Sequence, residues 1–314
     1  MTAVPGGRHA AFDTSRPFTR AQALAHGISD RELAGADYQA LFRGVHVAAD
    51  VEVTPLLVAT GALSLFPADA HASHATAARL YRLPIPPLPQ EHVTVRRADD
   101  RRRRAGVACH VAAQAQTRLL AGIRVSTPEQ VFLDLASQLP LVDLVVVGDH
   151  LVRRGLVSRK RLTAFCAAAS GKGAAQARAA AAFVRERVDS PMETRLRMLI
   201  LLAGLPEPVV NRTFGDEDGL GFRRYDLCWP RARLIVEYDG RHHIERESQW
   251  ESDLERRERI EDDRWRIVVV TGRGIYSTPG HTVAKIHRLL LERRMPGTPK
   301  TLSRRWQQHF PGHA

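Results

Sequence analysis

The chain has 314 residues, enough for two or more domains, and its apolar content of 44% is typical of a globular protein. Its formal net charge is +12, and arginine carries most of the excess. This charge favours a polyanionic partner, nucleic acid before an anionic membrane, although an arginine-rich composition without such a partner would produce the same value.

Cysteine usage and hydropathy exclude several classes of protein. The three cysteines, Cys109, Cys166 and Cys228, are far apart and form no CxxC pair, which argues against a disulfide framework or a zinc ribbon. The N-terminal residues lack the apolar core of a signal peptide, and no stretch approaches the roughly 20 apolar residues of a membrane span. We therefore expect a cytoplasmic protein with no membrane partner.

Two helix signals follow an N-terminal segment, residues 1–15, which is small, polar and expected to be disordered. Thr19 and Gly27 fit the cap and the stop of one short helix. Ser29, with Glu32 three residues later, forms a capping box that predicts the start of a second helix.

The segment 16–53 is predicted to be a winged helix-turn-helix, because a β-hairpin around Arg43 follows the two helices. The second helix, expected over Asp30–Ala36, would be the recognition element, with Arg31 and Arg43 as nucleic-acid contacts. A small helical docking domain with solvated arginines fits the pattern equally well.

A family resemblance supports the first interpretation. The run from Phe18 to Val47 resembles the N-terminal winged-helix domain of the abortive-infection type IV antitoxin family. The matching features are the segment that ends in Gly27, the helix around Leu33 and the RGVHV hairpin. The resemblance implies docking on DNA, on a protein partner or on a second copy of the chain.

The segment 54–185 resembles the middle α/β region of antitoxin-like proteins, and no catalytic constellation is evident in it. His71 and His74 lie about one turn apart, which could suit a metal. With no carboxylate or third histidine expected nearby, a capped helix end is preferred over a metal site. The arginine run 101–104 could bind phosphate, but an exposed turn is the preferred interpretation. The Gly-Lys-Gly at 171–173 lacks the spacing of a phosphate loop.

A helix start opens the segment 186–296, which we expect to be a separate domain followed by a tail, 297–314. Ser190 is the predicted cap, and Glu193 follows three residues later. Glu193 is therefore either a capping acid or a functional carboxylate, and the pattern leaves both open.

A predicted hairpin then brings carboxylates together. YDLCW and LIVEY read as two strands joined by the turn PRAR, and alternate strand residues share a face. Asp226, Glu237 and Asp239 are expected on one small surface, where they would repel each other unless a cation lay among them. Such oxygen ligands favour Mg²⁺, Mn²⁺ or Ca²⁺ over Zn²⁺. A polar helix over 248–263, a buried strand RWRIVVVTGRGIY and a closing helix complete the expected order.

The last domain resembles the very-short-patch-repair endonuclease-like branch of the restriction-endonuclease-like superfamily. The resemblance is carried by the motifs METRLR, RYDLCWP, LIVEYDGRHH and WRIVVVT and by the Asp253–Arg256 pair. The resemblance covers about a third of the chain, and it implies metal-dependent phosphodiester hydrolysis. It implies a metal held by Asp226, Glu237, the Tyr238 carbonyl and Asp239, oriented by Glu193. Proton transfer would fall to His242 or His243. Arg256 or Arg257 would either contact phosphate or pair with Asp253.

The chain departs from that pattern at Asp239, which stands where the superfamily usually has a lysine, and at Arg264, which replaces a turn glycine. The short-patch-repair relatives also lack the lysine and use histidine near this place.

The sequence therefore predicts a multidomain α/β protein with an N-terminal winged helix-turn-helix, a middle α/β region and a C-terminal restriction-endonuclease-like α/β domain. The expected function is that of a DNA endonuclease using Mg²⁺ or Mn²⁺. The alternative is a non-catalytic DNA-binding regulator or antitoxin with an inactive nuclease fold. The sequence does not distinguish DNA from RNA as the target.

Overall fold

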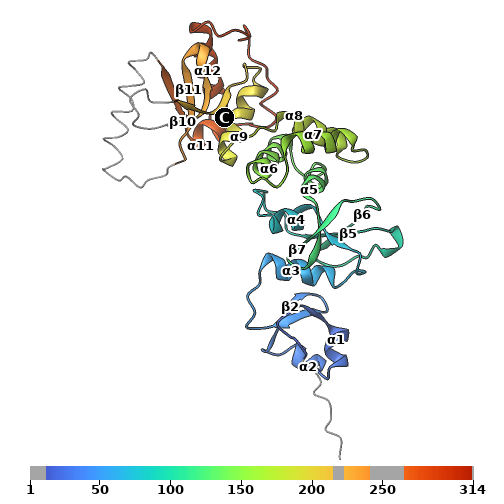
Figure 1. Cartoon of the computed structure of the whole chain (residues 1–314). Coiled ribbons are helices and arrows are strands. Elements are labelled where there is room, and N and C mark those ends of the chain that lie inside the picture. Colours follow the sequence, from blue (N-terminus) through green and yellow to red (C-terminus); the bar gives the residue numbers. More distant parts are fainter. Residues whose placement is uncertain (1–11, 215–222, 241–264, 313–314) are drawn as a thin grey trace, which may run out of the picture. The chain divides into compact units, whose positions relative to one another are not determined.

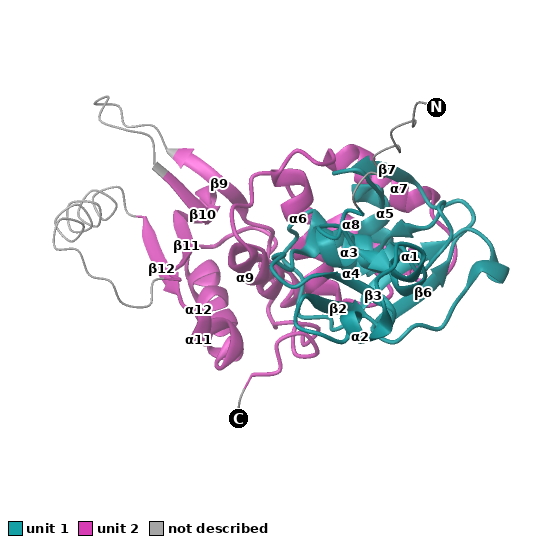
Figure 2. Cartoon of the chain, turned by 90° about the horizontal axis from the view of Figure 1, so that it is seen from below, with its two compact units in different colours: residues 1–135 teal, residues 136–314 magenta. Residues whose placement is uncertain are grey.

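The computed structural model describes residues 12–214, 223–240 and 265–312 (Figure 1). The chain is mixed α/β and divides into two compact units, 1–135 and 136–314 (Figure 2). The multidomain α/β class expected from the sequence is confirmed, and each unit is described below by itself.

Unit 1 begins with a small three-stranded antiparallel sheet in the order β1-β3-β2, accompanied by two short helices. These elements are β1 (Phe18–Thr19), α1 (Arg20–Ala25), α2 (Asp30–Leu33), β2 (Tyr38–Phe42) and β3 (Val45–Ala48).

Both predicted caps of these helices are confirmed. Thr19 forms a capping box with Gln22, and Ser29 forms one with Glu32. The second helix is shorter than expected, because α2 ends at Leu33 and not at Ala36. The residues after it include Gly35, which favours a turn over a further helical turn.

The part of the segment 1–15 that the structure describes is packed against this region. The Phe12 ring stacks on His26 at 4.3 Å between centroids and meets Phe18 edge to face. Residues 1–11 lie outside the described residues.

The larger sheet of unit 1 has five strands in the order β6-β5-β4-β8-β7. They are β4 (His71–Ala72), β5 (Glu91–Val95), β6 (Val107–Val111), β7 (Thr117–Leu120) and β8 (Ile123–Ser126). The helical elements of this part are α3 (Pro55–Leu63), α4 (His74–Leu80), the single turn η1 (Ala98–Asp100) and α5 (Pro128–Leu135).

Helix α4 packs against β5, β8 and α5. Its buried face consists of small residues such as Ala75, Ala77 and Ala78, so the helix can approach the strands closely. Two hydrogen bonds from Thr76 join α4 to the start of β5: its hydroxyl donates to Glu91 at 2.5 Å and accepts from the His92 N–H at 2.7 Å.

Unit 2 begins with four helices, α6 (Leu141–Arg153), α7 (Arg159–Ala168), α8 (Ala174–Phe183) and α9 (Pro191–Leu202). Gly171 and Gly173, both at φ +83°, lie in the turn between α7 and α8, so the Gly-Lys-Gly connects two helices. Ser190 caps α9 as predicted, and Gly204 follows its end at φ +80°.

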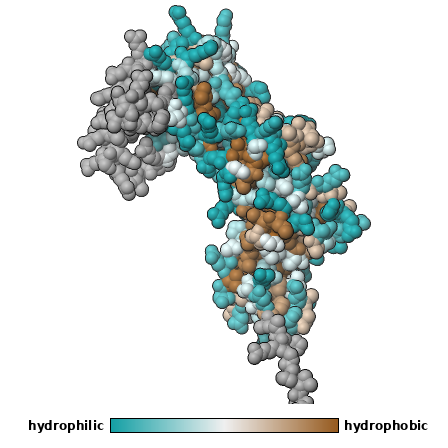
Figure 3. Space-filling model, viewed as in Figure 1, coloured by the Kyte–Doolittle hydropathy of each residue, from teal (hydrophilic) through white to brown (hydrophobic). Residues whose placement is uncertain are grey.

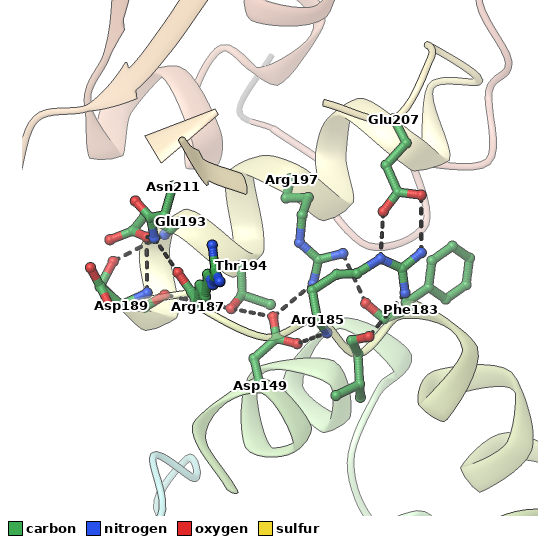
Figure 4. Close-up of polar contacts among 12 residues, drawn as sticks. Asp149, Phe183, Arg185, Arg187, Asp189, Glu193, Thr194, Arg197, Glu207 and Asn211 are labelled. Carbon is green, nitrogen blue, oxygen red and sulfur yellow. Dashed lines mark hydrogen bonds and ion pairs between the residues drawn. The ribbon is translucent and has the colours of Figure 1, made fainter. Parts of the chain in front are cut away.

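A buried ion pair fastens α9 to α6. The Arg197 side chain is 0% exposed and donates from Nη2 to Asp149 Oδ2 at 2.7 Å. Asp149 also accepts from the Thr194 hydroxyl and from the Arg185 N–H (Figure 4). Burial raises the pKa of the Asp149 carboxyl, while Arg197 and these donors act in the opposite direction.

The sheet of unit 2 has the order β12-β11-β10-β9. Its strands are β9 (Val209–Phe214), β10 (Arg223–Trp229), β11 (Leu234–Tyr238) and β12 (Arg266–Val270); β11 and β12 are parallel, and the other pairs are antiparallel. The turn η2 (Pro230–Ala232) joins β10 to β11, and α11 (Gly272–Tyr276) and α12 (Pro279–Glu292) follow β12.

Helix α9 packs on β10 and β11, and α11 and α12 pack against α9, so the three helices gather on one side of the sheet (Figure 2). The prediction of one buried strand from RWRIVVVTGRGIY is wrong in two respects. The strand ends at Val270, and GRGIY forms α11. Val269 is 46% exposed while Val268 and Val270 on either side of it are buried, so among the described residues the strand is covered on one face and not on both.

Among the described residues, none of the helices is long and apolar enough to cross a membrane. On the face drawn in Figure 3, apolar side chains appear as separate patches between hydrophilic ones.

We expect Asp149→Ala to lower the free energy of unfolding by about 3–5 kcal/mol, because it leaves the Arg197 guanidinium buried without its carboxylate. Urea denaturation followed by circular dichroism measures this change.

The matched control is Glu292→Ala, which removes the carboxylate of an exposed i,i+4 pair with Arg288. We expect that variant to lose less than about 1 kcal/mol. Equal losses in the two variants would contradict the role assigned to the buried pair.

Candidate functional site

The predicted carboxylates lie on two neighbouring strands of unit 2. The register pairs Leu227 of β10 with Val236 of β11, so the preceding Asp226 and the following Glu237 lie opposite each other across the hairpin. The hairpin closes through η2 and Arg233, which adopts a left-handed conformation at φ 45°. Both strands are anchored by buried apolar neighbours, whereas Asp226 and Glu237 are half-buried.

Asp226 is held by a backbone contact. Its Oδ2 accepts a hydrogen bond from the Tyr238 N–H at 2.8 Å. The Asp239 N–H in turn donates to the Val270 carbonyl at 2.9 Å, which continues the pairing of β11 with β12 beyond Tyr238. Backbone hydrogen bonds therefore hold both Tyr238 and Asp239, two of the four positions that the resemblance associates with metal binding.

Glu193 reaches this region from the first turn of α9. Its Oε2 accepts from the Asp189 N–H at 3.0 Å and from Asn211 Nδ2 at 3.1 Å, while its own N–H donates to Ser190 Oγ (Figure 4). Asn211 also donates to the Arg187 carbonyl and sits at φ 46°, an unusual backbone for a residue within a strand. The carboxylate thus takes part in the helix start and is not free to turn away into solvent.

The same carboxylate is coupled to Asp226. The pKa of Glu193 is raised, first by burial and second by the negative charge of Asp226. The hydrogen bonds from Asn211 and Ser190 act in the opposite direction. Both interpretations of Glu193 that the sequence left open therefore have a structural counterpart: it contributes to the helix start, and it lies close enough to Asp226 to feel its charge.

The ligand atoms of Asp226, Glu237 and Asp239 are not all within 4.8 Å of one another, the spacing that a shared metal ion would require. Among the described residues, the group of three or more His, Cys, Asp or Glu with ligand atoms within 4.8 Å of one another is made by histidines, and it includes none of Asp226, Glu237 and Asp239. His242, His243, Arg256 and Arg257 lie outside the described residues, as does the predicted polar helix over 248–263.

The arginines singled out in unit 1 are exposed. Arg31 lies on α2 and Arg43 in the turn between β2 and β3. The run Arg101–Arg104 lines an open hollow of about 370 Å³ together with Val107 and Cys109.

The histidine cluster of unit 1 was missed by the sequence analysis. It consists of His74, His92 and His110, and the buried carboxylate of Asp134 lies 3.8 Å from His74 Nδ1. The argument that His74 has no third histidine or carboxylate nearby is therefore wrong, whereas His71 is not part of the cluster. The one sequence signal was the placement of His92 and His110 within the strand patterns EHVTV and VACHV.

No family model matches the chain. Among curated proteins, two relatives from two strains of Mycobacterium tuberculosis, the uncharacterized proteins MT2308 and Rv2248, are each 26% identical over 193 residues. The aligned region covers 61% of this chain and 71% of each relative.

The pKa of Glu193 predicts a pH-dependent stability. Because the pKa is raised above its ordinary value of 4.5, the stabilising contribution of this group is fully present below that pH and is lost as the pH rises through the raised pKa. In metal-free buffer, wild-type protein should therefore lose stability relative to Glu193→Gln as the pH rises from about 4 to 8, measured by urea unfolding.

Glu207→Gln is the control with the opposite sign. Hydrogen bonds from Arg185 lower the pKa of Glu207, so its contribution is present above 4.5 and is lost as the pH falls. Parallel pH profiles for the two variants would contradict the assigned environments.

Proposed function

We propose that the chain is a metal-dependent endonuclease that hydrolyses phosphodiester bonds in DNA. The observation that carries the proposal is the placement of three acidic residues on one framework. Asp226 and Glu237 lie opposite each other on antiparallel strands, and Glu193 approaches Asp226 from the helix that precedes them.

The order of elements supports the resemblance to the restriction-endonuclease-like superfamily. A helix, α9, precedes the antiparallel strands β9, β10 and β11, and β12 then pairs parallel to β11. A parallel neighbour for the last strand requires a long crossover, and the segment 241–264 provides its length.

The donor set fits a hard divalent cation. Asp226, Glu237 and Asp239 offer carboxylate oxygens, and the negative charge of Asp226 already raises the pKa of Glu193. Asp226 and Glu237 would hold Mg²⁺ or Mn²⁺ together with the Tyr238 carbonyl and Asp239. The cation would offset charge on the phosphoryl oxygens and acidify water.

The remaining residues have roles that follow from their chemistry. Glu193, anchored by Asn211 and by the Asp189 N–H, would orient the acidic group from the helix side. His242 or His243 would exchange the proton with the attacking water or the leaving oxygen, because the ordinary pKa of imidazole suits either direction. Arg256 or Arg257 would contact the phosphate.

We assign the N-terminal part of unit 1 to docking on DNA through a winged helix-turn-helix. Two observations support this assignment: two short capped helices occur together with a three-stranded sheet, and Arg31 and Arg43 are exposed. The net charge of +12 favours binding to the phosphate backbone.

A second candidate function is that of a DNA-binding regulator or antitoxin that does not cut. Asp239, in the position where the superfamily usually has lysine, favours it because a cation that would stabilise the transition state is replaced by an anion. If the protein binds DNA but does not cut it, this second function is favoured over the nuclease. If it cuts RNA and not DNA, it is a nuclease with a different substrate.

The nuclease proposal predicts that full-length protein nicks supercoiled plasmid with Mg²⁺ or Mn²⁺ and that EDTA abolishes the nicking. Asp226→Ala and Glu237→Ala should each reduce the rate about 100-fold or more, the loss of roughly 3 kcal/mol of charge stabilisation. Agarose-gel conversion of supercoiled to open-circular plasmid measures the rate.

Glu292→Ala removes an exposed carboxylate on α12 and should cut at the wild-type rate. Circular dichroism of each variant checks that the fold is retained. Nicking that persists in both Asp226→Ala and Glu237→Ala would place the activity elsewhere or in a contaminant.

The docking assignment predicts a salt dependence. Arg31→Ala and Arg43→Ala should each weaken DNA binding similarly for all sequences and reduce the slope of log K against log salt by about 1. Fluorescence anisotropy on a labelled duplex at several salt concentrations measures the slope. Arg288→Ala, an exposed arginine of α12, is the matched control, and unchanged slopes for both Arg31→Ala and Arg43→Ala would contradict the assignment.

A further inference from the structure

Three histidines from three separate elements of unit 1 meet at one place. His74 is the first residue of α4, His92 lies on β5 and His110 on β6. One ring nitrogen of each lies within 4.8 Å of those of the other two, and His92 Nδ1 is 2.9 Å from His110 Nε2. The three rings are nearly parallel, with interplanar angles of 20° or less.

The strand register explains why two of the rings are together. β5 and β6 are parallel, with His92 opposite Ala108 and His110 opposite Thr94. The two histidines are therefore two positions out of register and project from the same face of neighbouring strands. Helix α4 covers that face and contributes the third ring.

The surroundings of the three histidines differ in how far they exclude water. His92 is 5% exposed, whereas His110 is half-buried. The guanidinium of Arg79, on the same helix as His74, is paired with Glu91 at 2.7 Å, so a carboxylate balances its charge.

A buried carboxylate and a hydroxyl flank the His74 ring. His74 Nδ1 is 3.0 Å from Ser73 Oγ and 3.8 Å from Asp134 Oδ2. Asp134 accepts hydrogen bonds from Ser126 and Gln130, yet burial raises its pKa to about 6. Metal-binding histidines commonly direct their second nitrogen to such a carboxylate or hydroxyl.

The backbone of His74 is also unusual. It has φ 45° at the start of α4, a conformation that costs free energy for a residue other than glycine. The His74 backbone N–H contributes to lowering the pKa of Asp134, which links this conformation to the carboxylate.

We propose that His74, His92 and His110 form a binding site for a transition-metal ion of the Zn²⁺ class. Asp134 positions His74, because it accepts from the His74 backbone N–H and its Oδ2 lies 3.8 Å from the ring Nδ1. Three imidazole nitrogens suit Zn²⁺, Co²⁺ or Ni²⁺ and do not suit Mg²⁺. Tetrahedral Zn–N bonds of about 2.0–2.1 Å place ligand nitrogens ~3.3 Å apart. Binding therefore requires the nitrogens to close from separations of up to 4.8 Å and the stacked rings to turn until one nitrogen of each faces the ion. The ion joins α4 to β5 and β6. This site is separate from the carboxylates of unit 2 and does not depend on the proposed nuclease activity.

The test is a Zn²⁺ titration of untagged, chelator-stripped full-length protein by isothermal calorimetry, repeated with Co²⁺ by visible absorption. To remove the carboxylate site, the same titrations are run on Asp226→Ala/Glu237→Ala. In Asp226→Ala/Glu237→Ala we expect one equivalent of Zn²⁺, a Co²⁺ spectrum of low-coordinate nitrogen ligation, and no competition from excess Mg²⁺. The wild type should show the same Mg²⁺-resistant equivalent.

His110→Gln and His92→Gln should lose this equivalent, while Asp134→Asn should keep it with roughly tenfold or greater weakening. His71→Gln is the matched control, because His71 is equally buried in the same unit but outside the cluster, and it should bind as the wild type does. Circular dichroism and the midpoint of urea unfolding show whether each variant is folded.

The proposal is overturned if the wild-type protein takes up no Zn²⁺ or if His110→Gln and His92→Gln both retain the equivalent. If a histidine variant fails to fold, the Co²⁺ spectrum of the wild type and the Zn²⁺ affinity of Asp134→Asn test the site instead. A wild-type spectrum of nitrogen ligation together with weaker Zn²⁺ binding by Asp134→Asn supports the site. A wild-type spectrum of oxygen ligands alone overturns it.

Discussion

The buried pair of Arg197 and Asp149 sets the position of the helix on which the candidate nuclease site depends. Arg197 and Glu193 are four residues apart on α9 and therefore lie on the same side of the helix. Thr194, between them, also donates to Asp149 at 2.9 Å. Fixing this turn against α6 fixes the direction from which Glu193 approaches Asp226, because a helix moves as a rigid element.

Polar groups are taken out of water in both units, but the charge is balanced in different ways. In unit 2 the protein supplies the cation, since Arg197 faces Asp149 and also donates to the Phe183 carbonyl. In unit 1 the cluster consists of three imidazoles beside the carboxylate of Asp134. A metal ion would give the second cluster what Arg197 gives the first, a positive charge in a buried place.

The elements that were predicted well depend on residues close together in the chain. The caps at Thr19, Ser29 and Ser190 act over three residues, and each is confirmed. The hairpin of β10 and β11 was likewise readable, because its turn joins adjacent strands. The exposure of Val269 could not be predicted from the sequence. The run from Ile267 to Val270 is apolar at every position, so it does not indicate which of these residues face the helices.

The sequence by itself determined the hairpin that carries Asp226 and Glu237, since strand alternation and a short turn place both residues through local geometry. Only the tertiary structure decided what surrounds them and what else converges. Asp149 and Arg197 are 48 residues apart, and His92 and His110 are 18 apart, so no period of helix or strand relates either pair. Each pair meets because of which helices and strands pack together. The periodicity of apolar residues indicates the helices and strands, but it does not indicate which of them bring buried polar side chains into contact.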